Sequence, residues 1–105
     1  METATEKQLE YLNTLIERER MSGDETERNW YNSQFASWGY RTHGDEFADM
    51  DAAQKDRAWA EFCNRVNNRL GAIATTLNDL SKPDASALID QLKRTDKLAL
   101  AMGAP

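Results

Sequence analysis

The sequence contains few of the residues on which metal sites and many catalytic sites depend. Its 105 residues include one cysteine, Cys63, and one histidine, His43. One cysteine cannot form an internal disulfide, which fits a reducing compartment, and these two residues supply too few ligands for a zinc site. Cys63 lies on an apolar helical stripe, where a free cysteine is most often a small buried hydrophobe. His43 lies next to Gly44 in a stretch that we interpret as an exposed loop, without the partner and pocket that a general base needs.

Other signatures of chemistry are also missing. There is no glycine-rich phosphate loop, and the acidic residues between Asp45 and Asp56 do not have the spacing of a calcium-binding EF-hand loop. We therefore expect no catalytic residue, no bound metal and no cofactor, and hence no enzyme.

Long apolar runs are absent as well, so no segment is predicted to span a bilayer. The first residues lack the basic and apolar regions of a signal peptide. These two absences, with the single cysteine, predict a cytoplasmic protein.

The charge is acidic, with a net value of −5. Residues 1–27 hold eight acidic and three basic side chains, so −8 + 3 gives this segment a charge of −5. Nucleic-acid binding draws on clusters of Lys and Arg that neutralise phosphates, and no such cluster is present. A protein partner therefore fits the charge better than DNA or RNA. One alternative stays open, a nucleic-acid-associated accessory protein that uses the basic residues of one predicted helix: Lys55, Arg57, Arg65 and Arg69.

Four helices are predicted from their caps and from the spacing of apolar residues. They cover approximately residues 6–21, 24–38, 51–79 and 82–102. A capping box that begins at Thr5 precedes the first helix, and Ser81 precedes the last. Asp24-Glu25-Thr26-Glu27 is interpreted as the cap of the second helix, and Asp51-Ala52-Ala53-Gln54 opens the third. Gly39 is expected to end the second helix, and residues 39–50 to form a loop with a short turn around Phe47. No segment combines β-branched residues with alternating polarity, so no strand is predicted.

The third predicted helix carries a narrow apolar seam. Its residues are spaced alternately four and three apart, the heptad pattern of coiled-coil-like packing: Trp59, Cys63, Val66, Leu70, Ile73, Leu77 and Leu80. The seam could be buried inside one chain or against a second copy, which would give a homodimer through residues 59–80. Because only three heptads are present and three other helices can cover them, we expect burial within one chain. Gly71 is the weak position of this helix, by about 1 kcal/mol relative to alanine.

Eight of the nine aromatic residues fall between residues 30 and 62. Most of them are expected to form the core between the second and third helices, with Tyr31, Phe35 and Trp38 pointing inward. Exposed aromatic residues, by contrast, dominate the hot spots of protein interfaces. Three aromatics fall outside the predicted stripe and are the candidate partner-binding residues: Trp30, Tyr40 and Phe47.

Two blocks near the ends of the chain carry a resemblance. The first reads T-E-K-Q-L-E-Y-L from Thr5, and the second reads L-S-K-P-D-A-S-A-L-I-D-Q-L from Leu80. They resemble a largely uncharacterised small helical module of actinobacteria and their bacteriophages, with a T-x-K-Q helix followed by an L-S-K-x-D-A-S-x-x-I-D-x-L helix. The resemblance implies a phage or actinobacterial origin near DNA metabolism, but no mechanism. Residues 24–79 are longer than the usual connection, and we expect the protein-specific function in this aromatic-rich insertion.

The sequence therefore predicts an all-α fold, a compact bundle of about four helices with one long central helix, in a single domain of residues 1–105. The predicted function is that of a non-enzymatic, phage-encoded protein in the host cytoplasm. It would bind a host or phage protein as an adaptor or inhibitor.

Overall fold

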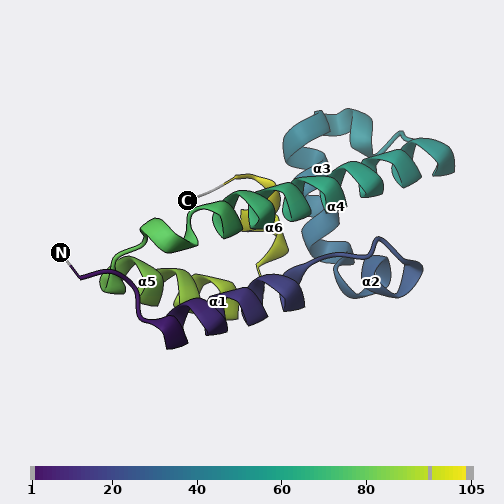
Figure 1. Cartoon of the computed structure of the whole chain (residues 1–105). Coiled ribbons are helices and arrows are strands. Elements are labelled where there is room, and N and C mark those ends of the chain that lie inside the picture. The colour runs from purple at the N-terminus through teal and green to yellow at the C-terminus, as the bar shows by residue number, and fades with distance from the viewer. Residues whose placement is uncertain (1, 95, 104–105) are drawn as a thin grey trace. The chain divides into compact units, whose positions relative to one another are not determined.

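A computed structural model describes residues 2–94 and 96–103 of the chain. In these residues it contains no strand, and its helices are α1 (Glu6–Glu19), α2 (Glu25–Trp30), α3 (Asn32–His43), α4 (Ala52–Thr75), α5 (Lys82–Lys93), α6 (Lys97–Ala101) and the short 3-10 helices η1 (Gly44–Phe47) and η2 (Leu77–Asp79) (Figure 1). The predicted all-α fold, with four main helices of which one is long, is confirmed. Within the described residues, no helix is long and apolar enough to cross a membrane.

The chain divides into two compact units by its internal contacts. Unit 1 consists of Met1–Arg20 and Asn68–Asp96, and unit 2 consists of Met21–Asn67 and Lys97–Pro105. The boundary between the units therefore falls inside α4. The prediction of a single domain stays a prediction.

Unit 1 is built on the pairing of α1 with α5, which lie side by side in Figure 1. The predicted capping box is present, because the Gln8 N–H donates to Thr5 Oγ1 at 3.1 Å and the Thr5 N–H donates to Gln8 Oε1 at 2.9 Å. The Gln8 side-chain nitrogen also donates to the Lys82 carbonyl at 3.3 Å and to Ser86 Oγ at 3.1 Å. One side chain thus caps α1 and fastens it to the start of α5. Ser81 caps α5 as predicted, accepting the Asp84 N–H at 3.2 Å.

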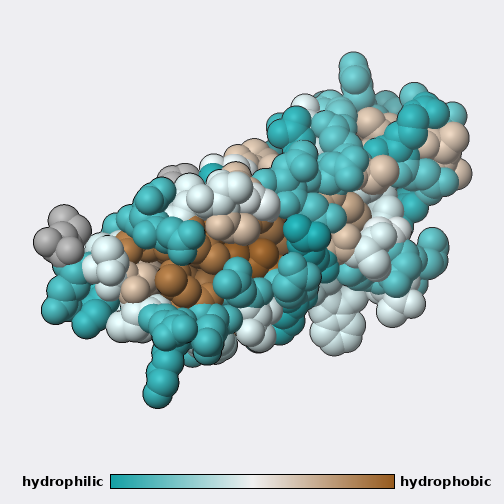
Figure 2. Space-filling model, in the orientation of Figure 1, coloured by the Kyte–Doolittle hydropathy of each residue, from teal (hydrophilic) through white to brown (hydrophobic). Residues whose placement is uncertain are grey.

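The apolar faces of these helices form the core of unit 1. Leu12 and Leu15 of α1 and Ala85 and Leu92 of α5 are buried. Several other aliphatic residues of the unit are only half-buried, namely Leu9, Leu80, Leu88 and Ile89. Figure 2 shows apolar side chains at the surface over this part of the chain.

Unit 2 has an aromatic core centred on Phe35 of α3. Its ring centroid lies 5.4 Å from that of Phe47, 5.3 Å from that of Trp59 and 5.8 Å from that of Phe62. Trp38 stacks beside Phe35 at 6.3 Å and is 1% exposed. Aromatic pairs at these distances contribute about 0.5–1.5 kcal/mol beyond the area that they bury. The expectation that most of the aromatics form one core is confirmed for these rings.

The predicted second helix is interrupted, and it continues beyond Gly39. Tyr31 leaves helical geometry at φ −100° and ψ 19°, which separates α2 from α3. Gly39 is a buried residue inside α3, and a Cβ atom there would overlap the ring of Phe47. Helix α3 ends at His43, and its C-cap is Gly44, where φ is +64°, a conformation that favours glycine. The prediction that Gly39 ends the helix was wrong because this glycine makes room for a side chain rather than for a turn.

The long helix begins as predicted and ends earlier. Asp51 and Gln54 form a capping box, with hydrogen bonds of 2.8 Å and 2.9 Å between the backbone N–H of each and the side chain of the other. Helix α4 ends at Thr75, and η2 covers the last predicted turn. Six of the seven seam residues are buried in the single chain, while Leu80 is half-buried. Pairing of two copies through the seam would require these side chains to leave their buried positions.

The last predicted helix is two helices in the structure. Helix α5 ends at Lys93 and α6 begins at Lys97, while Thr95 lies outside the described residues. The Leu98 N–H, in the first turn of α6, donates to Gln34 Oε1 of α3 at 2.9 Å. A side chain distant in sequence thus satisfies one of the backbone donors that a helix start leaves unpaired.

Candidate functional site

Two of the three predicted partner-binding residues lie at the surface. Trp30, the last residue of α2, is 81% exposed, and Tyr40 of α3 is 49% exposed. Helix α2 has no buried residue at all. Tryptophan side chains are highly buried on average. The exposure of Trp30 is therefore unusual for its residue type.

Phe47 does not share this exposure. The side chain is 5% exposed, and its ring packs against Phe35 and, at 5.1 Å, against Tyr40. The Lys55 ammonium lies 5.9 Å from the ring centroid. The expectation that Phe47 is exposed was wrong, because η1 folds this residue back onto the glycine of α3. No periodic signal in residues 39–50 could have indicated this.

His43 is also placed differently from the expectation. It is the last residue of α3 rather than an exposed loop residue, and its ring is edge-on to Trp38 at 5.6 Å. Its Nε2 lies 3.7 Å from Glu61 Oε2, and Arg65 Nε lies 3.4 Å from Glu61 Oε1. His43 and Glu61 border a shallow pocket of about 250 Å³ that also includes Arg57. Within the described residues, no three His, Cys, Asp or Glu side chains are grouped so as to hold a metal ion.

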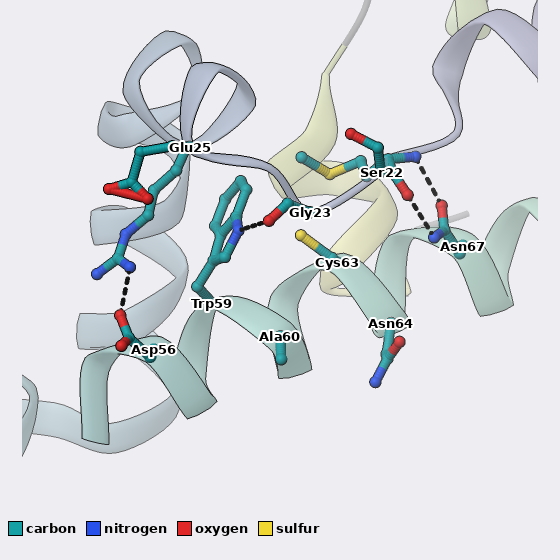
Figure 3. A pocket seen from close by; sticks show the side chains of 11 residues that line it. Ser22, Gly23, Glu25, Asp56, Trp59, Ala60, Cys63, Asn64 and Asn67 are labelled. Carbon is teal, nitrogen blue, oxygen red and sulfur yellow. Dashed lines mark hydrogen bonds and ion pairs between the residues drawn. The ribbon is translucent and has the colours of Figure 1, made fainter. Parts of the chain in front are cut away.

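A larger pocket, of about 470 Å³, lies in unit 2 between the loop of residues 21–24 and α4. The loop is fastened to α4 at two points, as Figure 3 shows. Asn67 accepts the Met21 N–H and donates to the Met21 carbonyl, both at 2.9 Å. The indole N–H of Trp59 donates to the Gly23 carbonyl at 2.9 Å.

The start of α2 holds the same loop from the other side. The Glu27 carboxylate accepts the Ser22 N–H at 3.1 Å and the Gly23 N–H at 2.8 Å. Asp24 caps α2 by accepting the Glu27 N–H at 2.8 Å. The backbone N–H groups of Met21, Ser22 and Gly23 are therefore all hydrogen-bonded. The loop that bounds the pocket is held in place by these bonds.

The pocket has an apolar floor and a charged rim. Trp59, Ala60 and Cys63 contribute the floor from α4. On the rim, Arg28 Nη1 donates to Asp56 Oδ1 at 2.7 Å, and Glu25 lies nearby. Burial, and after it the negative charge of Glu27, raise the pKa of the Cys63 thiol from 9.0 to about 11. Near neutral pH the cysteine is therefore a neutral wall of the pocket and a weak nucleophile.

Comparisons with known proteins give no relative. No family model, curated protein or solved structure matches this chain. The exposed aromatic residues and the pocket are therefore the features that bear on function.

Sequence reasoning did not find the pocket. The pocket is formed by hydrogen bonds between residues that are distant in the sequence. Gly23 and Trp59 are 36 residues apart, and Met21 and Asn67 are 46 residues apart. The one local signal was the Asp24 cap, which indicated where α2 begins but not where the preceding loop lies.

Proposed function

We propose that this chain is a non-enzymatic protein-binding protein whose binding surface in unit 2 is centred on Trp30. The observation that carries the proposal is the 81% exposure of Trp30 at the end of a six-residue helix with no buried residue. Glu27 and Arg28 face the rest of unit 2, but no residue of α2 is buried, so packing into the core does not account for Trp30. A short helix whose one large apolar side chain faces solvent is explained by a partner that covers it.

The physical basis is the amount of surface that tryptophan buries on association. A tryptophan buries about 150–250 Å² and loses little side-chain entropy, which is why it dominates interface hot spots. The α2 helix also carries Glu25 and Glu27, in a segment with an excess of acidic residues. A partner with a complementary basic rim would associate faster and more selectively than a neutral one.

The origin and setting of the protein are part of the same proposal. The resemblance of the two end blocks to the actinobacterial and phage module supports a phage origin, with a host or phage protein as the partner and the host cytoplasm as the location. Binding of this kind suits an adaptor or an inhibitor. Tyr40, which is also exposed in unit 2, is a second candidate contact.

The nucleic-acid alternative receives less support from the surroundings of its basic residues. Arg65 is paired with Glu61, Lys55 lies over the ring of Phe47, and Arg28, outside the proposed set, is paired with Asp56. A basic side chain that is already ion-paired, as Arg65 is with Glu61, contributes little to phosphate binding. A gel shift that weakens steeply with salt would favour this alternative.

The test is affinity capture with a matched control. Wild-type protein, Trp30→Ala and Tyr11→Ala are each used as bait in an actinobacterial lysate, since Tyr11 is an exposed aromatic residue of unit 1. A retained protein is identified, purified and titrated by calorimetry. We expect Trp30→Ala to weaken its binding at least about thirtyfold, the effect of a hot spot of about 2 kcal/mol, and Tyr11→Ala to bind as wild type. Equal binding by all three baits contradicts the proposal.

A further inference from the structure

The pocket between the loop of residues 21–24 and α4 has a defined shape before any partner arrives. Three side chains fix its roof: Asn67 holds both backbone groups of Met21, Trp59 holds the Gly23 carbonyl, and Glu27 holds two N–H groups. A preformed site binds without the entropic cost of ordering a loop. The fixed loop keeps the pocket open, so the pocket is suited to hold a side chain.

The charged groups of the pocket that remain available to a ligand are mainly carboxylates. The one cationic side chain on the rim, Arg28, is already bonded to Asp56 at 2.7 Å. Both oxygens of Glu27 are engaged by the loop, and their charge still acts on Cys63. The negatively charged groups that remain for a ligand are the Glu25 carboxylate and the second oxygen of Asp56, while Ser22 and Asn64 add neutral polar side chains to the lining. An anionic ligand would have to draw Arg28 away from Asp56, whereas a cation would leave that pair intact.

The net charge of the residues that line the pocket also favours a cationic ligand over an anionic one. Glu25 and Asp56 supply two negative charges and Arg28 one positive charge, so −2 + 1 leaves −1 on the rim, and the carboxylate of Glu27 adds to it. Beneath the rim, the alkyl part of a long basic side chain would contact the apolar floor. Arginine and lysine both combine an apolar stem with a cationic end.

We propose that this pocket binds the cationic side chain of an arginine or lysine residue of the partner protein. The inference rests on the proposed protein-binding function and adds the chemistry of the contact: Trp30 supplies apolar area, and the pocket selects a basic residue. The charge of the side chain is recognised by Glu25 and Asp56, and its stem by the floor of Trp59 and Ala60.

The experiment tests the pocket without the partner. Full-length ¹⁵N-labelled protein is titrated with N-acetyl-arginine amide, N-acetyl-lysine amide and, as the uncharged analogue of similar length, N-acetyl-norleucine amide. The indole N–H of Trp59 and the amide of Gly23 report on the pocket because they belong to its boundary. We expect saturable shifts of these signals with one or both cations, and the cation that binds more tightly identifies the preferred residue.

Two variants of equal charge change provide the control. Glu25→Gln removes a rim charge that fastens neither the loop nor α4, and Glu10→Gln removes an exposed acidic group of unit 1. We expect Glu25→Gln to weaken cation binding at least about fivefold, the effect of a charge-assisted contact, and Glu10→Gln to leave it unchanged. The inference is overturned by equal shifts with norleucine amide, by equal weakening in both variants, or by the absence of saturable binding. None of these results changes the effect of Trp30→Ala on capture, so the proposed function is judged separately.

Discussion

Gly39 and Gly71 are both helical glycines, and replacing each with alanine should change stability in opposite directions. Alanine favours a helix interior over glycine by about 1 kcal/mol. At Gly71, in α4, no atom lies within 4 Å of the position of an added Cβ, so Gly71→Ala should raise the free energy of unfolding by about this amount. At Gly39, in α3, the added Cβ would overlap three atoms of the Phe47 ring.

The size of the Gly39 effect follows from what Phe47 would lose. The ring is buried between Phe35 and Tyr40, and displacing it entirely would cost about 3–5 kcal/mol, the cost of deleting a buried phenylalanine. Subtracting the gain in helix propensity leaves a net destabilisation of about 2–4 kcal/mol for Gly39→Ala. This is a large part of the stability of a small protein.

The two substitutions need different probes. All three tryptophans lie in unit 2 with Gly39, so urea unfolding followed by fluorescence reports on that substitution. Gly71 lies in unit 1, where far-UV circular dichroism is the suitable signal. A double-mutant cycle then identifies the cause, because Gly39→Ala should no longer destabilise a Phe47→Ala background. If Gly39→Ala is as stable as the wild type, or equally harmful in both backgrounds, the packing argument is refuted.

Two further predictions concern the pocket. Asn67→Ala removes both hydrogen bonds to the backbone of Met21 and should lower the free energy of unfolding by about 1–3 kcal/mol. Urea unfolding followed by tryptophan fluorescence measures this change, and an unchanged midpoint would show that the loop is held without these bonds. For Cys63, the folded pKa of about 11 exceeds the ordinary 9.0, so the unfolded chain loses its thiol proton first as pH rises. The neutral, buried thiol therefore contributes fully to the free energy of unfolding below about pH 9, and this contribution is lost as the pH rises towards 11. At about pH 10.5 the loss amounts to about 2 kcal/mol. Comparing wild type with Cys63→Ala at about pH 8 and about pH 10.5 isolates this effect from other titrating groups, and a constant difference between the two proteins would refute it.

Where helices begin could be predicted because the deciding groups are close in sequence. The caps at Thr5, Asp51 and Ser81 each bind a residue three positions later, and all three are present. The part of the seam that lies inside α4, from Trp59 to Ile73, was also readable, since its spacing alone places these residues on one face. These features follow from the geometry of a single helix.

The tertiary structure decided which residues are exposed and where the pocket lies. Gly39 gave the local signal of a helix end, but its role is to admit the Phe47 ring, and the positive φ belongs to Gly44. Trp30 and Phe47 had equal standing as exposed aromatics in the sequence, yet only Trp30 faces solvent. Local hydrogen bonds and helical periodicity are properties of neighbouring residues, and the sequence by itself determined them. Burial and the fastening of the 21–24 loop depend on segments up to 46 residues apart, so they exist only once the chain has folded.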